Sequence, residues 1–368
     1  MSYRRQINRD IRKALLQLYP QNQLNGHQVR HLNTMIAMMS GMVQSKSCHL
    51  EKIARKVPDS NQVESRSKRF SRALKHDVVT PTLFFLPFVT PLLEGLVKSG
   101  PLALAMDGSE TGRHCITLMV SVIYKKRAIP IAWLVTKGCK GHLPEKLHLE
   151  LLNDVKKIVP ESAHIIFLGD GEFDGVDLQE AISQAGWEYV VRTAKNGIVT
   201  DAGDQFSLKE VAIEPGQLLE IPDIELTRDR YGPVTLLIWW EKGYEKPIYL
   251  VTNMECSEEA CSYYRRRFRI ETFFSDQKSR GFNLQRSHQA EPERQKRLLI
   301  PACLAYIWMI FLGESAKPHQ EIMRQIHRAD RCDLSLFQIG LRYLDHLLEL
   351  EETIPISFVL PGIMKSVR

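Results

Sequence analysis

The sequence predicts an α/β protein in which a mixed β-sheet domain, interrupted by a β-rich insertion, lies between two helical ends. Three observations support this fold class. Near the N-terminus, apolar residues recur every three to four positions, which is typical of helices. From Pro101 onward, short apolar β-rich runs alternate with helical segments. Residues 197–253 hold further strand-like runs separated by Gly-Pro and Gly-Tyr turns.

Residues 1–76 read as a helical DNA-binding domain, followed by a connecting helix or linker over 77–100. The helical segment LEKIARKV is followed by the turn PDSN and then by the basic segment QVESRSKRFSRAL. A helix, a short turn and a basic second helix resemble a helix-turn-helix. An ordinary basic helical domain is the alternative. On the first interpretation, four residues would face DNA: Arg66, Lys68, Arg69 and Arg72.

Residues 101–196 form the first part of the predicted sheet domain. The runs LALAMD, ITLMVSVIY and IPIAWLV read as three strands, and PEKLHLELLNDVKKIV reads as a helix that follows them. HIIFLGD, GVDLQEAISQAG and WEYVVRT then read as a strand, a helix and a strand. The predicted order is therefore β-β-β-α-β-α-β, which indicates a mixed sheet.

Two aspartates stand where the first and fourth predicted strands end. Asp107 and Asp170 are each followed by glycine. A lone Asp-Gly usually marks a turn, but carboxylates at strand ends also point into the crevice where such sheets bind ligands. We expect the neighbouring acidic residues to lie at the periphery of the site or on the surface: Glu110, Glu172 and Asp174.

The segment from Ser257 to Gly281 reads as one helix, with Ser257 capping its start and Gly281 closing its end. At about 100° per residue, one narrow face carries Tyr264, Arg267, Glu271 and Lys278. One interpretation is an ion-paired surface helix in which Glu271 neutralises Arg267. The other is a metal-binding carboxylate flanked by cations that bind phosphate, which would join Glu271 to Asp107 and Asp170 as oxygen ligands for Mg²⁺.

The β-rich insertion over 197–253 contains two adjacent tryptophans, Trp239 and Trp240. On a strand one of them faces inward and the other outward. They are either packing residues or an aromatic platform for an unstacked base. The remaining chain is predicted as the second part of the sheet domain over 254–315 and a C-terminal helical region over 316–368. The leucine-rich segment FQIGLRYLDHLLELEE in that region is either a dimer face or part of the core, and we expect it to join the core.

Charge is unevenly distributed. Residues 1–76 hold 15 lysines and arginines against 4 acidic residues, residues 77–260 hold 17 against 27, and residues 261–300 hold 10 against 4. A basic head, an acidic middle and a basic helix suggest a polyanion held around an acidic, metal-binding centre. The seven cysteines are scattered without a CxxC pair, which indicates neither a zinc site nor a disulfide framework. The apolar run 298–313 contains Pro301 and is shorter than the roughly 20 residues of a membrane span, so we expect a buried helix and no membrane partner.

Tyr264, Arg267, Glu271 and Lys278 match the Y-x2-R-x3-E-x6-K signature, so the chain resembles bacterial insertion-sequence transposases of the DDE class, in the insertion-sequence-four family. The resemblance covers about residues 100–285. It implies a ribonuclease H-like catalytic domain with Asp107, Asp170 and Glu271 as ligands of two Mg²⁺ ions, for which Mn²⁺ would substitute. Tyr264, Arg267 and Lys278 would hold phosphates. Three aromatic residues are candidates for stacking a flipped base: Trp239, Trp240 and Phe268.

The resemblance also implies a function. The protein would cut DNA at transposon ends and transfer the freed 3′-OH into target DNA, in a cut-and-paste reaction through a hairpin intermediate. Its partners would be double-stranded DNA, with terminal inverted repeats and target, and a second copy in a synaptic dimer. It would act in the bacterial cytoplasm at the nucleoid. The alternatives are a metal-dependent nuclease without strand transfer and a catalytically silent or domesticated DNA-binding regulator.

Overall fold

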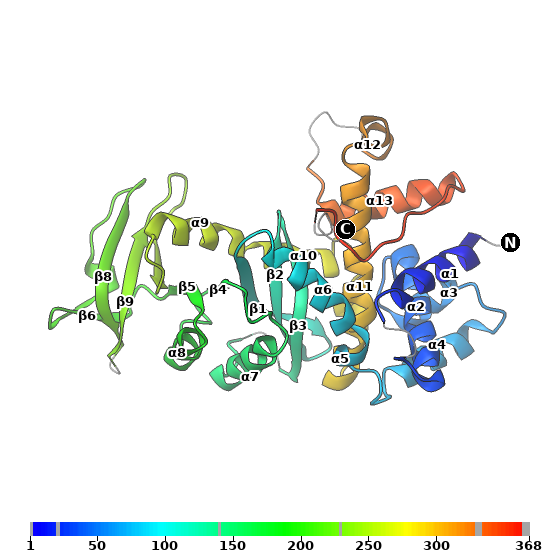
Figure 1. Cartoon of the computed structure of the whole chain (residues 1–368), viewed down its shortest axis with the longest axis horizontal. Coiled ribbons are helices and arrows are strands. Elements are labelled where there is room, and N and C mark those ends of the chain that lie inside the picture. Colours follow the sequence, from blue (N-terminus) through cyan, green and yellow to red (C-terminus); the bar gives the residue numbers. More distant parts are fainter. Residues whose placement is uncertain (1–2, 20–22, 139–140, 228–229, 328–332, 363–368) are drawn as a thin grey trace.

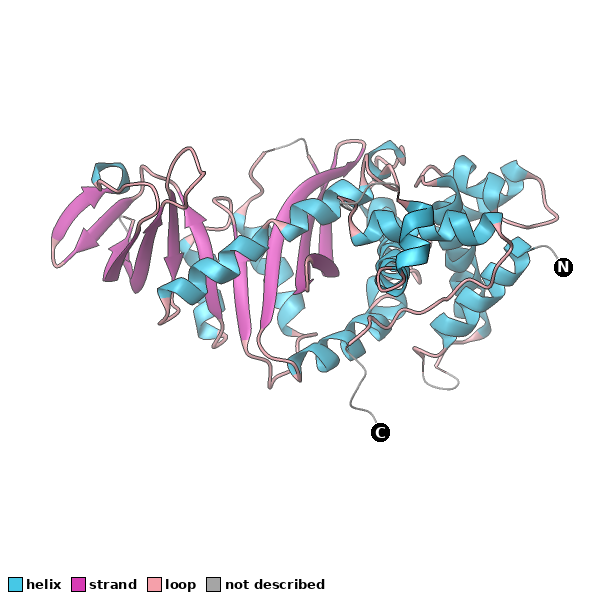
Figure 2. Cartoon of the chain, turned by 90° about the horizontal axis from the view of Figure 1, so that it is seen from above, coloured by secondary structure: helices cyan, strands magenta, loops and turns pink. Residues whose placement is uncertain are grey.

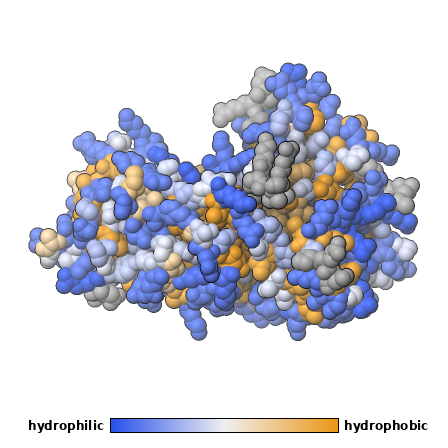
Figure 3. Space-filling view, viewed as in Figure 1, coloured by the Kyte–Doolittle hydropathy of each residue, from blue (hydrophilic) through white to orange (hydrophobic). Residues whose placement is uncertain are grey.

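The structure is a computed structural model that describes residues 3–19, 23–138, 141–227, 230–327 and 333–362. Figure 1 shows an elongated molecule with the outer strands at one end, the N-terminal helices at the other and the long helix α11 beside those helices. In Figure 2 the strands stand in one row, with helices on both sides of the row. The face in Figure 3 is mostly hydrophilic and is hollowed between the strand-rich end and the C-terminal helices.

The N-terminal region is helical, as predicted. Helix α2 begins with a capping box between Asn25 and Gln28, and its middle is buried, including Met38 and Met39. The predicted helix, turn and basic helix over 50–74 are also present, as α3, a turn and α4. The helices of this region and its connection to the sheet are α1 (Tyr3–Leu16), α2 (Gly26–Ser45), α3 (Leu50–Lys56), α4 (Val63–Ala73), α5 (Pro81–Phe84) and α6 (Leu86–Val97).

A ten-stranded mixed sheet forms the centre of the molecule, in the order β3-β2-β1-β4-β5-β10-β9-β8-β6-β7. Strands β1, β4 and β5 are parallel to one another, and the other pairings are antiparallel. The predicted strands and the two helices between them are confirmed. They are β1 (Leu102–Gly112), β2 (Cys115–Tyr124), β3 (Arg127–Lys137), α7 (Glu145–Lys156), β4 (Ile165–Gly169), α8 (Val176–Gln184) and β5 (Glu188–Thr193).

The stretch over 197–253 is rich in strands, and these extend the central sheet. Strand β10 pairs with β5 on one side and with β9 on the other, so the sheet continues without a break. This continuity fixes the start of the next helix beside the ends of β4 and β5. The elements of the stretch are β6 (Ile198–Asp201), β7 (Asp204–Ser207), η1 (Leu208–Glu210), β8 (Leu218–Leu226), β9 (Tyr231–Trp239) and β10 (Ile248–Thr252).

Strand β1 is longer than predicted. It does not end at Asp107 but continues to Gly112, with Asp107 opposite Met119 of β2 and Ser109 opposite Thr117. The long apolar strand β2 supplies hydrogen-bonding partners for residues that the sequence alone suggests are a turn. The buried hydroxyls of Thr111 and Thr117 also lie 2.6 Å apart and bond to each other. Asp107 therefore sits within a paired strand, which holds its backbone in place.

The predicted helix over 257–281 is in fact two helices, α9 (Ser257–Arg267) and α10 (Arg269–Gln277). Phe268, with ψ near zero, breaks the regular hydrogen bonding between them, and its ring is 46% exposed. The expected cap at Ser257 is also wrong, because Cys256 occupies the cap position and the Ser257 hydroxyl donates to the carboxylate of Glu220.

Gly281 does not close the helix either, since α10 ends at Gln277. Its role is close packing. A Cβ atom at this position would lie 2.3 Å from the Asp276 carbonyl oxygen and 2.3 Å from the Phe337 ring. The position thus requires glycine because two other elements approach its backbone.

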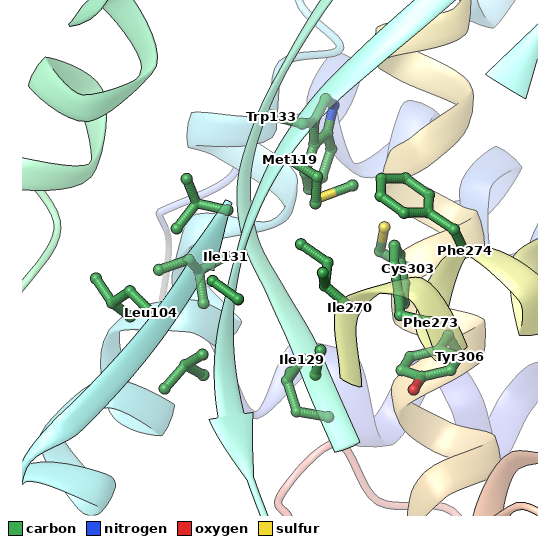
Figure 4. Close-up of a cluster of buried hydrophobic side chains, with 14 of the residues drawn as sticks. Leu104, Met119, Ile129, Ile131, Trp133, Ile270, Phe273, Phe274, Cys303 and Tyr306 are labelled. Atoms are coloured by element: carbon green, nitrogen blue, oxygen red, sulfur yellow. The ribbon is translucent and has the colours of Figure 1, made fainter. Parts of the chain in front are cut away.

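Helix α10 is anchored to the sheet by a cluster of buried side chains. Figure 4 shows Ile270, Phe273 and Phe274 of α10 between Met119 of the sheet and Tyr306 of α11. These apolar residues fix which face of α10 is turned away from the core. Ile270 and Phe274 therefore anchor α10 to the core.

Helix α11 (Pro292–Ala316) is long and apolar enough to cross a membrane by length and composition, but 83% of its most apolar window is buried inside the fold. The prediction of a buried core helix is therefore confirmed. Helix α13 (Leu336–Glu349) packs against it with its leucine-rich face, as expected. The remaining elements are η2 (Leu284–Arg286) and α12 (Gln320–Ile326). Five cysteines are free thiols, and Cys139 and Cys332 lie outside the described residues.

Candidate active site

The two aspartates lie side by side on neighbouring parallel strands, Asp107 within β1 and Asp170 directly after β4. The β1–β4 register pairs Ala105 with Leu168, so continuing it by two residues sets Asp107 opposite Asp170. Neighbouring strands are about 4.8 Å apart, which brings the carboxylates into electrostatic reach of each other. Burial, followed by the charge of Asp170, raises the pKa of Asp107 to about 7. The sequence-based placement of both aspartates at one crevice is thus reproduced, although Asp107 does not end its strand.

Local backbone bonds orient both carboxylates. The Gly108 N–H donates to Asp107 Oδ1 at 2.8 Å, and the Glu172 N–H donates to Asp170 Oδ1 at 3.0 Å. Neither glycine of the Asp-Gly pairs is required for space, because a Cβ atom would lie no closer than 3.8 Å to its neighbours at Gly108 and 3.9 Å at Gly171.

Arg267 lies between Asp170 and Glu271. Its Nη2 donates to Glu271 Oε1, and its Nη1 lies 3.8 Å from Asp170 Oδ2. The Arg267 side chain is 13% exposed, whereas that of Glu271 is 55% exposed. Burial acts to lower the pKa of Arg267, but Tyr264, Glu271 and Asp170 outweigh it and raise the pKa. Glu271 therefore pairs with Arg267, as the ion-pair interpretation predicts. It also lies beside the two aspartates, as the metal-site interpretation requires.

The other signature residues lie around this centre. Lys278 follows α10, and its Nζ donates to the Ser109 hydroxyl of β1 at 2.6 Å. The Tyr264 ring centroid is 5.9 Å from the Arg267 guanidinium carbon, and burial raises the pKa of the phenol. The sequence predicts that four residues share one face of the helix. Despite the break at Phe268, they lie together near Asp107 of β1 and Asp170 after β4: Tyr264, Arg267, Glu271 and Lys278.

The donor set fits a divalent metal ion. Asp107, Asp170 and Glu271 supply carboxylate oxygens, the ligands that Mg²⁺ prefers. The pKa of Asp107 is raised in part by the other two carboxylates, and a bound cation would relieve this crowding of negative charge. Arg267 neutralises part of it, but Arg267 does not hydrogen-bond Asp107.

Two adjoining grooves open beside the carboxylates. The first, of about 550 Å³, is lined by Asp170, Glu271 and four cations: Arg192, Lys195, Lys246 and Arg267. The second, of about 410 Å³, shares three of those cations and is lined with aromatic rings: Trp239, Tyr244, Tyr264 and Phe268. Together they form a basic channel that leads from the carboxylates to an aromatic pocket.

The three aromatic candidates for base stacking separate in the structure. Trp239, at the end of β9, lines the aromatic groove with Phe268, and the Arg265 guanidinium lies 4.6 Å from its ring. Trp239 is 6% exposed and Phe268 is 46% exposed. The Nε1 of Trp240 donates to the Tyr244 carbonyl at 2.9 Å. Trp239 and Phe268 therefore belong to the site geometrically, whereas Trp240 does not line either groove among the described residues.

The acidic neighbours lie at the periphery, as expected. Glu172 accepts from the Leu143 N–H at 2.7 Å, Asp174 accepts from the Thr193 hydroxyl at 2.8 Å, and Glu110 is exposed. Each is held by a contact of its own or faces solvent.

The four basic residues of α4 lie at the other end of the molecule from the outer strands (Figure 1) and divide into two pairs. Arg66 donates to the Val57 carbonyl, and Arg69 forms a 2.8 Å ion pair with Asp59, so both stabilise the packing of α4 against the preceding turn. Lys68 and Arg72 are exposed.

Sequence reasoning missed four cations and one tyrosine that line the grooves. Arg192 lies at the carboxyl end of β5, parallel to β4, so the strand-end rule that selected Asp170 also points to it. No comparable signal marks Tyr244 or Lys246, which the pairing of β9 with β10 brings to the site, or Arg265 of α9. Lys195 follows β5 and is likewise placed by the sheet.

Comparison with known proteins relates the chain to one family. A family model described as the transposase DDE domain matches residues 100–308. Among curated proteins, no sequence matches the chain. A solved structure, a piggyBac transposase synaptic complex with hairpin DNA, is 13% identical with a TM-score of 0.46 and covers 94% of this chain and 79% of its own. Because the family match spans more than half of the sequence and includes Asp107, Asp170 and Glu271, the chain belongs to the transposase DDE domain family.

Proposed function

We propose that the protein is a transposase of the insertion-sequence-four type, which cuts DNA at transposon ends and joins the freed 3′-OH to target DNA. The observation that carries the proposal is the convergence of Asp107, Asp170 and Glu271 beside a basic channel. On this proposal β1 and β4 of the sheet, together with α10, belong to a ribonuclease H-like catalytic core that holds all three carboxylates.

The three carboxylates would hold two Mg²⁺ ions, with Mn²⁺ as a substitute. Bound metal ions activate the attacking oxygen and stabilise the leaving one in phosphodiester chemistry. The chain itself supplies the rest. Arg192, Lys246 and Arg267 bind DNA phosphates along the channel, and Lys278 and Tyr264 contact the backbone nearer to Ser109 and Arg267. Such contacts position the polyanion without reading its sequence.

The reaction begins with water attacking the phosphodiester at the transposon end, so that a 3′ oxygen leaves as a free 3′-OH. That hydroxyl attacks the opposite strand, which closes a hairpin and releases the flanking DNA. A second water opens the hairpin and restores the 3′-OH. The hydroxyl then attacks target DNA, where one phosphodiester bond forms as another breaks. Each transesterification conserves the number of bonds.

Hairpin formation requires a bent DNA end with a base out of the stack. Phe268 presents an exposed ring and Trp239 lines the same groove, so we assign base stacking to these two residues. Alanine at Trp239 or Phe268 should leave first-strand nicking largely intact and reduce hairpin formation. Trp240→Ala is the matched control, because Trp240 lines neither of the two grooves. Normal hairpin yields from both Trp239→Ala and Phe268→Ala would rule the assignment out.

The proposed partners are double-stranded DNA carrying terminal inverted repeats, target DNA and a second copy of the chain in a synaptic dimer. The exposed Lys68 and Arg72 of α4 would contribute phosphate contacts away from the catalytic channel. The proposed setting is the bacterial cytoplasm, at the nucleoid.

The decisive experiment incubates DNA from the flanks of this gene with wild-type protein and with Glu271→Gln, with and without Mg²⁺, and resolves the products on a denaturing gel. Mg²⁺-dependent nicks, hairpins and joined products, all absent in the variant, are the expected result. Nicks without joined products would indicate a nuclease without strand transfer. Binding without cleavage under any divalent metal would indicate a DNA-binding regulator and overturn the proposal.

A further inference from the structure

Three histidines meet in the N-terminal helical region, away from the carboxylates. His27 and His31 lie one turn apart on α2, and His76 lies just after α4. The ring centroids are 4.7 Å apart for His27 and His31, 4.9 Å for His27 and His76, and 4.5 Å for His31 and His76. The capping box of α2 fixes the turn that carries His27. Two sequence segments about 45 residues apart thus bring three imidazoles together.

The spacing of their nitrogens is close to that of a metal site. One ligand nitrogen from each histidine lies within 4.8 Å of the others. Tetrahedral ligands at the usual Zn–N distance of roughly 2.0–2.1 Å stand about 3.3–3.4 Å apart, a closure that side-chain rotation at this partly exposed site can supply. The Nδ1 atom of His76 accepts a long, 3.3 Å bond from the Val78 N–H, and a metal ion bound at Nδ1 would replace this weak bond.

Burial, then the neighbouring His76 and His27, then Arg30 lower the pKa of His31, which favours its neutral form. Neutral imidazole is the form that binds metal. His27 and His76 are exposed, so solvent can reach an ion bound there.

We propose that His27, His31 and His76 bind one Zn²⁺ ion, with water in the fourth position, and that this ion ties the start of α2 to the segment after α4. Imidazole ligands suit Zn²⁺, whereas Mg²⁺ prefers oxygen, so this site is chemically separate from the carboxylates. Its role is structural: it joins the helix-turn-helix-like pair to the rest of the N-terminal helices.

The test measures Zn²⁺ binding to tag-free, chelator-treated full-length protein by calorimetry, in saturating Mg²⁺. We expect one Zn²⁺ per chain and a thermal midpoint that rises with Zn²⁺. His31→Ala and His76→Ala should weaken binding by more than about 100-fold, since losing an outer-shell partner alone costs 10–100-fold. His319→Ala, which removes an exposed histidine outside the cluster, is the matched control and should bind as wild type does.

Asp170→Asn separates the two metal sites. Zn²⁺ binding that survives in Asp170→Asn and disappears in His76→Ala belongs to the histidines. Binding that disappears in Asp170→Asn and survives in His76→Ala belongs to the carboxylates and overturns the proposal. Wild-type protein that binds no Zn²⁺ overturns it as well. Because His76 is exposed, its replacement leaves the core intact, and circular dichroism of each variant checks this.

Discussion

Two regions of the molecule bury a carboxylate, and they do so differently. Burial comes first among the causes that raise the pKa of Asp107 to about 7 and that of Asp276 to about 6. Asp107 is half-buried, and two other carboxylates raise its pKa further. Asp276 is fully buried, 3.3 Å from the Ser335 hydroxyl and 4.0 Å from the Arg127 guanidinium. A raised pKa alone therefore does not identify a catalytic group; like charges beside an open groove point to catalysis, whereas a cation and a hydroxyl in the core point to structure.

The largest difference should appear in cleavage rate. Asp107→Asn removes a charged oxygen ligand from the carboxylate centre, and we expect it to slow DNA strand cleavage by on the order of 10³-fold or more. Asp276→Asn, a matched change at the other buried carboxylate, should cleave at close to the wild-type rate. Initial rates at saturating Mg²⁺ measure both. A folded Asp276→Asn that is as slow as Asp107→Asn would break the distinction.

We expect the opposite order for stability: a change at Asp276 should cost more free energy of unfolding than a change at the carboxylate centre. Asp276→Ala leaves the Arg127 side chain, which is 12% exposed, without its buried partner, and we expect a loss of about 3 kcal/mol in the free energy of unfolding. Asp107→Ala removes one of three like charges at the carboxylate centre, and Arg267 keeps its ion pairs with Asp170 and Glu271, so the change should cost little. Urea denaturation of metal-free protein measures both, and equal losses would contradict the assignment.

Two glycines, one near each buried carboxylate, should also differ in their tolerance of alanine. Gly281→Ala places a Cβ atom 2.3 Å from the Asp276 carbonyl oxygen and from the Phe337 ring, so we expect a loss of about 2 kcal/mol from overpacking. Gly108→Ala, next to Asp107, meets only the Leu143 side chain at an ordinary 3.8 Å and should leave stability nearly unchanged. Thermal unfolding of both variants is the measurement. A stable Gly281→Ala would show that the junction of α10 and α13 yields more easily than its packing implies.

The smallest expected effect is on pH dependence. The folded pKa of Asp107 lies above its unfolded value of about 3.9, so between these values the native state binds a proton that the unfolded state does not. The contribution of Asp107 to stability therefore falls as pH rises from about 4 to about 7. Asp107→Asn should therefore stabilise metal-free protein by on the order of 1 kcal/mol above pH 7, with the gain fading towards pH 4. A gain that is independent of pH would mean that charge on Asp107 does not cause it.

Much of this protein could be read from its sequence. The local periodicity of apolar residues predicts the strands and the helices α7 and α8, because it depends only on residues a few positions apart. The spacing of Tyr264, Arg267 and Glu271 places them on one side of a helix regardless of the rest of the fold. Asp107 and Asp170 follow from the strand-end rule. The N-terminal helices and the burial of α11 are likewise visible in periodicity and length.

Other features depend on contacts between distant segments. The continuation of β1 past Asp107 depends on pairing with β2, and the glycine at 281 on the approach of α13. Tyr244 and Lys246 line the grooves because they lie on the turn between β9 and β10, which strand pairing places beside α9. The meeting of His27 and His31 with His76 depends on how α2 packs against α4. The secondary-structure elements and the charged face over 264–278 follow from the sequence alone, because both depend on neighbours within a few residues. The strand ends, cations and aromatic rings around that face are set by the tertiary fold, because long-range strand pairing fixes their distances.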